Sequence, residues 1–224
     1  MTVTLRMSNG VLWCLRVAAT AAGVAIGFLV KPFTQWLVDL FDSAPGPLRA
    51  AAALPTEVAV PVLTVVGILV GLWLSHVALA ESLKLTVTTQ HVRLDQNGVE
   101  RHVPRERIAE VYLDAKKDLV LLDARTTELA RNKSTDLRAA DIEQAFTDLR
   151  YPWRGTSDPY ETSFQSWVDG HPTLDDTRNQ LLRNRARALT DKKTGAVAEL
   201  AEQLQGVGVV VRDRDGTQQY RLVR

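Results

Sequence analysis

The sequence predicts an α+β protein that combines a two-helix transmembrane hairpin, a small β-barrel with a C-terminal helix, and a small two-helix plus β-hairpin module. Three observations predict this class. Two long apolar runs lie in the first 80 residues, alternating apolar and polar residues follow from 83 to 131, and helical periodicity returns near the C-terminus before a hairpin pattern. We therefore expect domains at 1–80, 81–151 and 178–224, with a connector at 152–177.

The charged residues are distributed unevenly along the chain. Residues 1–80 carry only four Lys/Arg and three Asp/Glu, whereas residues 156–177 carry five acids and no Lys/Arg. Residues 178–224 carry ten basic and five acidic residues, so this segment is basic although the net charge of the whole chain is +1. This charge pattern favours a partner of negative charge for the C-terminal module.

The two apolar runs are long enough to cross a bilayer. Residues 17–30 contain no charge, and the run extends back to residue 11 across Arg16, whose guanidinium is expected to reach the headgroups. Residues 58–80 contain no formal charge over 23 positions, which exceeds the roughly 20 residues that a spanning helix needs. A cleaved signal peptide over residues 1–22 is the alternative, but the apolar run continues beyond it and no Ala-x-Ala site precedes a polar start.

Both apolar runs place small residues at every fourth position. Such a stripe lets two helices approach closely. We expect the stripes to pack the hairpin together, and homodimerisation is the alternative. The helix-packing residues predicted in this way are Gly23, Gly27, Gly67 and Gly71.

The segment between the two runs predicts a helix that lies in the membrane interface. Pro32 suits its first turn, and apolar residues then recur with helical spacing. These residues are Phe33, Trp36, Leu37, Leu40 and Phe41. The bilayer is thus an expected partner. Lys and Arg are nearly balanced on the two sides of the spans, and we predict a multi-pass protein of the cell membrane with both termini in the cytoplasm.

Residues 83–131 predict a run of short antiparallel strands. Leu83, Leu85 and Val87 share one face of the first strand, and Asn97-Gly98 is a pair that favours a tight hairpin turn. Further strands are expected at 108–114, 119–123 and 128–131. A helix should follow, because four apolar residues share one helical face before Pro152 prevents its extension. These four are Ile142, Ala145, Phe146 and Leu149.

This order of strands with one C-terminal helix resembles the pleckstrin-homology-like barrel. The chain also resembles the YqeB-type membrane proteins of actinobacteria over nearly its whole length. The resemblance implies the fold of residues 81–151 and names no activity. The segments that carry it are Glu81-Ser82-Leu83-Lys84, Val111-Tyr112-Leu113-Asp114, Leu119-Val120-Leu121-Leu122-Asp123, Glu128-Leu129-Ala130-Arg131, Tyr151-Pro152-Trp153-Arg154 and Asp158-Pro159-Tyr160.

The connector at 152–177 is acidic, and its aromatic residues indicate a packed segment instead of a disordered tether. Two helices are expected next, the second with Val197, Leu200, Ala201 and Leu204 on one face. Gln203-Leu204-Gln205-Gly206-Val207-Gly208-Val209-Val210-Val211-Arg212-Asp213 then resembles the helix-to-strand passage of the anticodon-binding tail of cysteinyl-tRNA synthetases. Asp215-Gly216 predicts the turn of the final hairpin.

The resemblance to the synthetase tail implies contact with RNA. The RNA-binding residues expected on this basis are Arg183, Arg187, Lys192, Tyr220 and Arg221. The alternative is that the basic residues form a solvated face or pair with the acidic connector. The synthetase tail commonly has a tryptophan near the position of Tyr220, so recognition of an anticodon does not follow from the match.

No pattern in the sequence indicates catalysis. The synthetase signatures His-Ile-Gly-His and Lys-Met-Ser-Lys-Ser are absent, as are a P-loop, a dinucleotide-binding glycine pattern and a Gly-x-Ser-x-Gly elbow. The single cysteine, Cys14, excludes an internal disulfide and is expected to be buried, and the four histidines lack the spacing of a metal site. We predict a non-enzymatic, membrane-anchored adaptor with no catalytic residue, cofactor or metal and with an unidentified protein partner. A membrane-tethered RNA-binding protein is the alternative.

Overall fold

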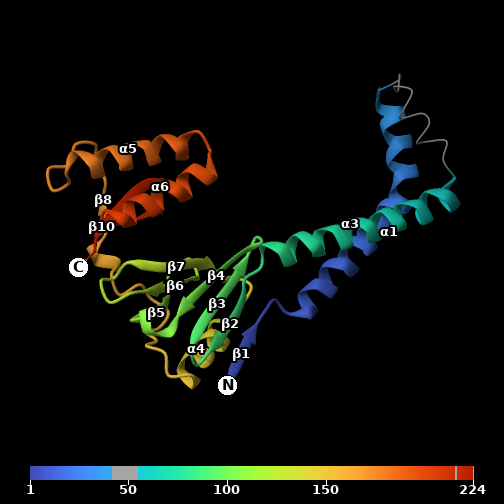
Figure 1. Cartoon of the computed structure of the whole chain (residues 1–224). Helices are drawn as coiled ribbons and strands as arrows, with labels where there is room; N and C mark the ends of the chain where they lie inside the picture. The colour runs from blue at the N-terminus through green and yellow to red at the C-terminus, as the bar shows by residue number, and fades with distance from the viewer. Residues whose placement is uncertain (42–54, 215, 224) are drawn as a thin grey trace. The chain divides into compact units, whose positions relative to one another are not determined.

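The computed structural model describes residues 1–41, 55–214 and 216–223, and side chains at 35 and 37–41 are left out of the description. The chain forms two compact units. One unit is the helical hairpin of Met7–Ser82, and the other combines Met1–Arg6 with Leu83–Arg224. Figure 1 shows both units and the elements that build them.

The hairpin consists of α1 (Asn9–Phe41) and α3 (Thr56–Glu81). Both helices contain a segment of 26 residues that is long and apolar enough to cross a membrane. The predicted interfacial helix is helical through Phe41, but it is continuous with the first span, and Pro32 lies inside α1. Only Phe33 and Trp36 of its five apolar side chains are described, and both are exposed, with their rings 6.0 Å apart.

The small-residue stripes bring α1 and α3 together. A Cβ added to Gly67 would lie 2.7 Å from the Ala19 carbonyl oxygen, and one added to Gly27 would lie 2.8 Å from Val60 Cα. A Cβ on Gly23 would collide with the Leu63 carbonyl oxygen, and one on Gly71 would press on Ala19 Cβ at 3.1 Å. The four predicted glycines therefore lie where the two helices of one chain meet. A homodimer would have to use another face of the hairpin.

The structure describes the surroundings of Cys14 and Arg16 in α1. Cys14 is exposed on the surface of the hairpin, so the expectation that it is buried was wrong. Helical periodicity places it on the side of α1 that α3 does not cover. The Arg16 guanidinium is held by α3, because Nε donates a hydrogen bond of 3.1 Å to Ser75 Oγ.

A four-stranded antiparallel sheet opens the second unit, in the order β1-β2-β3-β4. Its elements are β1 (Thr2–Leu5), β2 (Lys84–Thr88), β3 (His91–Gln96) and β4 (Val99–Pro104). The turn between β3 and β4 uses Asn97 at φ 55° and Gly98 at φ 73°, as the Asn-Gly pair predicts. The N-terminal strand pairs with β2 from Thr2↔Thr88 to Leu5↔Leu85. The predicted boundary at residue 81 misses this strand.

A second antiparallel sheet has the order β5-β6-β7, and a helix follows it. These elements are β5 (Glu110–Leu113), β6 (Asp118–Leu122), β7 (Glu128–Lys133) and α4 (Ala139–Asp148), with a short 3-10 turn at Arg105–Arg107 before β5. Apolar residues of both sheets and of α4 form one core, which includes Leu85, Leu121 and Phe146. The pleckstrin-homology-like barrel that the strand order resembles also has two packed sheets followed by one helix. The predicted α+β fold class is therefore confirmed.

The connector is ordered by its aromatic side chains. Trp153 stacks on Phe146 with 6.0 Å between ring centroids, and the Trp167 indole donates to Asn179 Oδ1 at 3.2 Å. The connector also contains a short 3-10 turn, Glu161–Ser163, and the strand β8 (Gln165–Ser166). The prediction of a packed segment is therefore confirmed.

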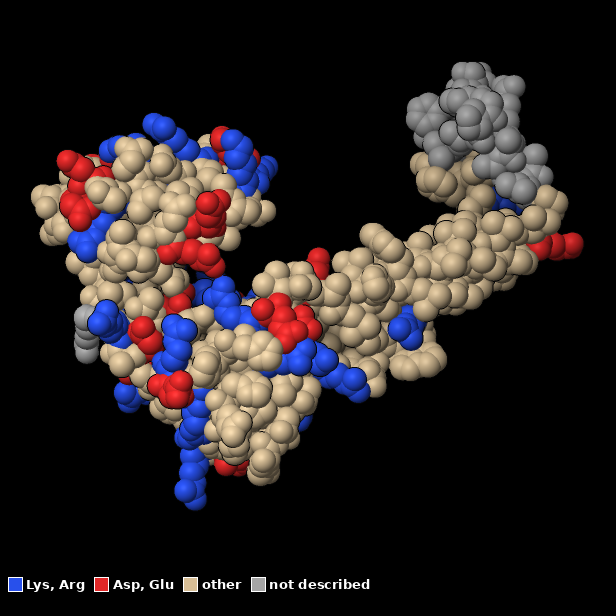
Figure 2. Space-filling view, viewed as in Figure 1, with Lys and Arg blue, Asp and Glu red and all other residues tan. Residues whose placement is uncertain are grey.

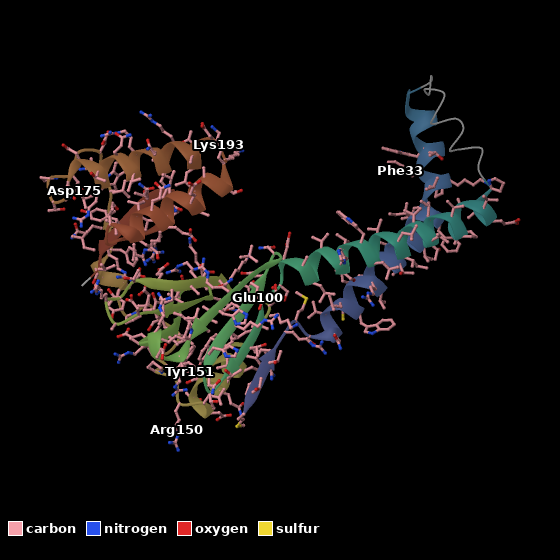
Figure 3. The ribbon with its side chains drawn as sticks, viewed as in Figure 1. Phe33, Glu100, Arg150, Tyr151, Asp175 and Lys193 are labelled. Carbon is pink, nitrogen blue, oxygen red and sulfur yellow. The ribbon has the colours of Figure 1, made fainter. Side chains whose placement is uncertain are left out.

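The C-terminal module contains the two helices and the hairpin that the sequence predicts. They are α5 (Asp176–Thr190), α6 (Thr194–Gly206), β9 (Val209–Arg214) and β10 (Thr217–Leu222), and β8 joins the hairpin in the order β8-β10-β9. Asp175 caps α5 by accepting a 2.8 Å hydrogen bond from the Arg178 backbone N–H. Figure 3 shows Asp175 at one end of this helical pair and Lys193 at the other. Leu182, Leu204, Val209 and Tyr220 form the core of the module.

Candidate binding cleft

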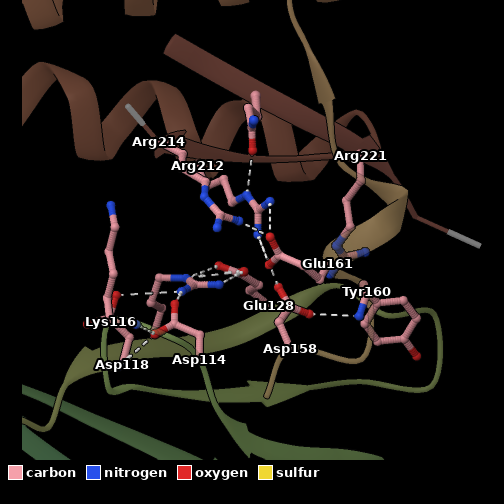
Figure 4. A network of polar contacts seen from close by, with 12 residues as sticks. Asp114, Lys116, Asp118, Glu128, Asp158, Tyr160, Glu161, Arg212, Arg214 and Arg221 are labelled. Carbon is pink, nitrogen blue, oxygen red and sulfur yellow. Dashed lines mark hydrogen bonds and ion pairs between the residues drawn. The ribbon is translucent and has the colours of Figure 1, made fainter. Parts of the chain in front are cut away.

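A polar cleft of about 530 Å³ lies between the β5–β7 sheet and the strand β9. We name it the charged cleft, because charged side chains from both parts of the unit line it. These side chains include Asp114, Asp118, Arg131, Arg185, Arg212 and Arg214. Figure 4 shows most of this network, with the acidic residues of the barrel opposite the arginines of β9.

The barrel side of the charged cleft is organised around Arg131 of β7. Its guanidinium pairs with Asp114 at 2.6 Å and with Glu128 at 2.7 Å, and Asp118 lies 3.6 Å away. Burial alone would lower the pKa of Arg131, but the hydrogen bonds and charges of Glu128 and Asp114 outweigh it and raise that pKa. Burial, reinforced by the negative charge of Asp114, raises the pKa of Asp118.

The sequence folds this way locally because Asp114 makes the β5–β6 turn. Its Oδ1 accepts hydrogen bonds of 2.9 Å from the backbone N–H groups of Lys116 and Asp118. This is the usual way in which an aspartate stabilises a turn. The turn leaves the Lys116 ammonium free to donate a 2.7 Å hydrogen bond to the Asp213 carbonyl oxygen. Lys116 is exposed, and this hydrogen bond joins the β5–β6 turn to the hairpin of the C-terminal module.

The opposite side of the charged cleft is formed by arginines of β9. Arg212 pairs with Glu161 at 2.6 Å and lies 3.6 Å from Asp158, and its guanidinium stacks 3.9 Å above the ring of Phe164. Arg214 also pairs with Glu161. Burial lowers the pKa of Arg212, although the charge of Asp158 opposes this shift. Two guanidinium groups thus share the carboxylate of Glu161.

Two further arginines are more deeply buried. Arg185 of α5 is 5% exposed, and its two terminal nitrogens bond both carboxylate oxygens of Asp213 at 2.8 and 2.7 Å. Arg221 of β10 is 2% exposed and donates to the Thr126 carbonyl oxygen at 2.7 Å, over the ring of Tyr160. Burial lowers the pKa of Arg221. Paired guanidinium groups in such positions stabilise contacts between chain segments far apart in sequence.

The structure does not bring the five predicted RNA-binding residues together on one surface. Tyr220 is 2% exposed and lies in the core of the module, and Arg221 is buried against Thr126. Neither can reach RNA from these positions, so that part of the prediction is corrected. Arg187 and Lys192 are exposed, and Arg183 pairs with Asp169 at 2.6 Å.

The charge network of the cleft was missed at the sequence level. Its residues come from five separate elements, and no spacing in the sequence links Arg131 to Arg212. The one useful signal was the acidic connector beside a basic module, which offered ion pairing as an alternative to RNA binding. The structure contains such pairs, since Arg183 contacts Asp169 and Arg212 contacts Glu161. Among the described residues, no group of three His, Cys, Asp or Glu is placed to hold a metal ion.

A barrel of two sheets and a helix, with a helical hairpin inserted after its first strand and a helix-hairpin module appended, defines a multi-domain protein of the pleckstrin-homology-like class. The chain belongs to the family of proteins with a YqeB-like bacterial PH domain, whose model matches residues 3–154. Residues 171–221 match the model of the cysteinyl-tRNA ligase anticodon binding domain. Both resemblances noted in the sequence are therefore confirmed.

A curated relative supports the same family. The chain is 30% identical over 207 residues to the uncharacterized protein YqeB of Bacillus subtilis (strain 168), and the alignment covers 92% of this chain and 85% of that protein. No solved structure matches the chain. The expected actinobacterial source stays a prediction.

Proposed function

We propose that this chain is a non-enzymatic adaptor, anchored in the cell membrane by its helical hairpin, that presents the PH-like domain and the basic module to a cytoplasmic partner. The pairing of β1 with β2 carries the proposal. These neighbouring strands of one sheet lie just before α1 and just after α3. Because the two strands pair, the start of α1 and the end of α3 must lie on the same side of the membrane.

The surface of the hairpin supports the anchoring. Large apolar side chains are exposed along both helices, among them Trp13, Phe28, Leu69 and Trp73. Figure 2 shows few charged atoms on this surface, whereas charges of both signs cover the other unit. A continuous apolar surface of this kind needs lipid or a partner to exclude water.

The other unit supports a binding role. Arginines of the module form ion pairs and hydrogen bonds with the connector and the barrel, as Arg212 does with Glu161 and Arg221 with Thr126. These contacts give a stable scaffold for recognition. The charged cleft offers a partner a concave surface lined by both signs of charge. Complementary charge at such a surface contributes specificity to protein association.

The test is the orientation of the hairpin in the membrane. A reporter active only in the cytoplasm is fused after residue 224, and Cys14→Ser removes the native thiol so that one cysteine placed in residues 42–54 can be labelled from outside. An active reporter together with external labelling supports the proposal. An inactive reporter, or a chain recovered in the soluble fraction without detergent, would overturn it.

RNA binding is the second candidate, because residues 171–221 match an anticodon binding domain. The exposed cations Arg187 and Lys192, together with the half-exposed Arg183 in the middle of α5, remain able to contact a phosphate backbone. Four arginines of the module, Arg185, Arg212, Arg214 and Arg221, are instead engaged within the unit. Because these four arginines are already used in contacts within the unit, the adaptor is favoured over an RNA-binding protein.

Binding of tRNA to the full chain in detergent, measured over a series of salt concentrations, separates the two candidates. If α5 contacts phosphate, removing Arg187 and Lys192 together should weaken binding and reduce the salt slope by about two, since each lost contact removes about one unit. The control is Lys117→Ala, which removes a charge from a turn of the barrel. Absence of tRNA binding at low salt would exclude this candidate.

A further inference from the structure

Arg16 is a charged residue inside the first apolar helix, and its guanidinium is hydrogen-bonded to α3. Its Nε donates to Ser75 Oγ at 3.1 Å, and Ser75 Oγ itself donates to the Gly71 carbonyl oxygen at 2.7 Å. Ser75 is 1% exposed, so this contact lies inside the helical pair. An arginine has two terminal nitrogens besides Nε, and these can bind a phosphate in a forked geometry.

An apolar groove of about 480 Å³ adjoins this guanidinium on the surface of the hairpin. Val17 and Thr20 of α1 and Ile68 and Leu72 of α3 line it, and Arg16 and Trp13 lie among them. The walls suit an acyl chain, and the arginine supplies a positive charge beside them. Lipids with an anionic headgroup combine these two properties.

The depth of Arg16 agrees with a phosphate partner. It lies seven residues after Asn9, which corresponds to about 10 Å along the helix axis. Trp13 and Trp73 are both exposed, and a Cβ on Gly71 would lie 3.2 Å from Arg16 Cα, so the two tryptophans lie close to this level of the hairpin. Tryptophans mark the headgroup region of membrane proteins, and a long arginine side chain reaches phosphate from just inside it.

We propose that the groove beside Arg16 binds one anionic phospholipid, with the phosphate on the Arg16 guanidinium and an acyl chain between α1 and α3. Ser75 acts as a positioning residue, because its Oγ accepts the hydrogen bond from Nε and so leaves the two terminal nitrogens for the phosphate. This inference rests on the proposed membrane anchoring and adds a lipid class to it.

The test titrates the delipidated full chain in detergent with phosphatidylglycerol and, separately, with phosphatidylcholine, and counts bound lipids by native mass spectrometry. One cationic side chain near an anionic lipid contributes about 1 kcal/mol, which corresponds to roughly a fivefold preference for phosphatidylglycerol. Arg16→Gln should reduce this preference to about onefold. Arg16→Lys and Ser75→Ala should give intermediate preferences, because the charge stays but its position is no longer fixed.

Lys31→Gln is the matched control, because it removes one exposed charge from α1 without touching the groove. A wild-type chain that binds the two lipids equally would overturn the inference while leaving the anchoring intact. Equal losses in the Lys31 and Arg16 variants would also overturn it, because the preference would then follow the total charge. If Arg16→Gln fails to fold, as helicity by circular dichroism reveals, Ser75→Ala decides the outcome. A chain that needs no detergent would refute the anchoring itself.

Discussion

At the scale of single residues, burial separates side chains that look alike in the sequence. Arg187 and Arg221 are both basic residues of the C-terminal module, but Arg187 is exposed to solvent and Arg221 is buried. Tyr220 has the aromatic ring expected of an RNA contact, yet it packs in the core of the module. The sequence predicts that these residues matter, but it does not show which of them face water.

Asp118 provides a prediction at this scale. Burial and Asp114 raise its pKa above the ordinary value of 3.8, so the folded protein loses stability as the pH rises through that raised pKa. Asp118→Asn, which has no charge to bury, should therefore be more stable than the wild type at pH 7. The difference should shrink as the pH falls through the raised pKa and below 3.8, where the aspartate becomes protonated in both the folded and the unfolded state.

The measurement is the thermal midpoint of the full chain in detergent, recorded across this pH range. Asp136→Asn, in an exposed turn before α4, is the control and should change the midpoint little at any pH. A lower midpoint for Asp118→Asn at pH 7 would mean that its contact with Arg131 outweighs the cost of burial.

At the scale of elements, periodicity predicts the helices and strands well. The strands from β2 to β7, the helix α4 and the two helices of the module were all expected from apolar spacing and turn residues. The glycine stripes also predicted the contact between α1 and α3. Close backbone approach makes that contact sensitive to any added atom.

Gly67→Ala should destabilise the hairpin, because the new Cβ would lie 2.7 Å from the Ala19 carbonyl oxygen. The expected loss is about 1–3 kcal/mol, as for other overpacked contacts. Unfolding in a titration with denaturing detergent, followed by circular dichroism, measures it. Gly10→Ala, near the start of α1, is the control, since its Cβ would meet only Ser8 Oγ at 3.5 Å, and its midpoint should stay near that of the wild type.

At the scale of the whole molecule, the hairpin is an insertion within the PH-like domain. The chain first forms β1, then the helices α1 and α3, and then β2, which pairs with β1. Val3 and Leu5 pack against the core of the barrel from the N-terminal side of the insertion. The two units are therefore joined by two chain segments, and the first of them is held by a strand pairing.

Leu5→Asp should destabilise the barrel by about 2 kcal/mol or more, because it places a carboxylate against the apolar core. Thr4→Asp is the matched control. Thr4 is exposed on the other face of β1, so this change should cost no more than about 0.5 kcal/mol. Thermal unfolding and limited proteolysis of the full chain compare the two variants, and similar losses in both would contradict the role given to Leu5.

The amino-acid sequence alone was enough to assign the class of each part of the chain: the two span-length helices, the β-rich barrel with its final helix, and the helix-hairpin module. These features depend on local spacing, turn residues and run length, which act over a few neighbouring residues. The folded structure was needed to see that Thr2–Leu5 completes the barrel, and that Arg131, Arg212 and Arg221 make contacts between separate segments. A four-residue strand is too short for its alternation of apolar and polar residues to be recognised alone. Ion pairs between distant segments produce no regular spacing of residues in the sequence.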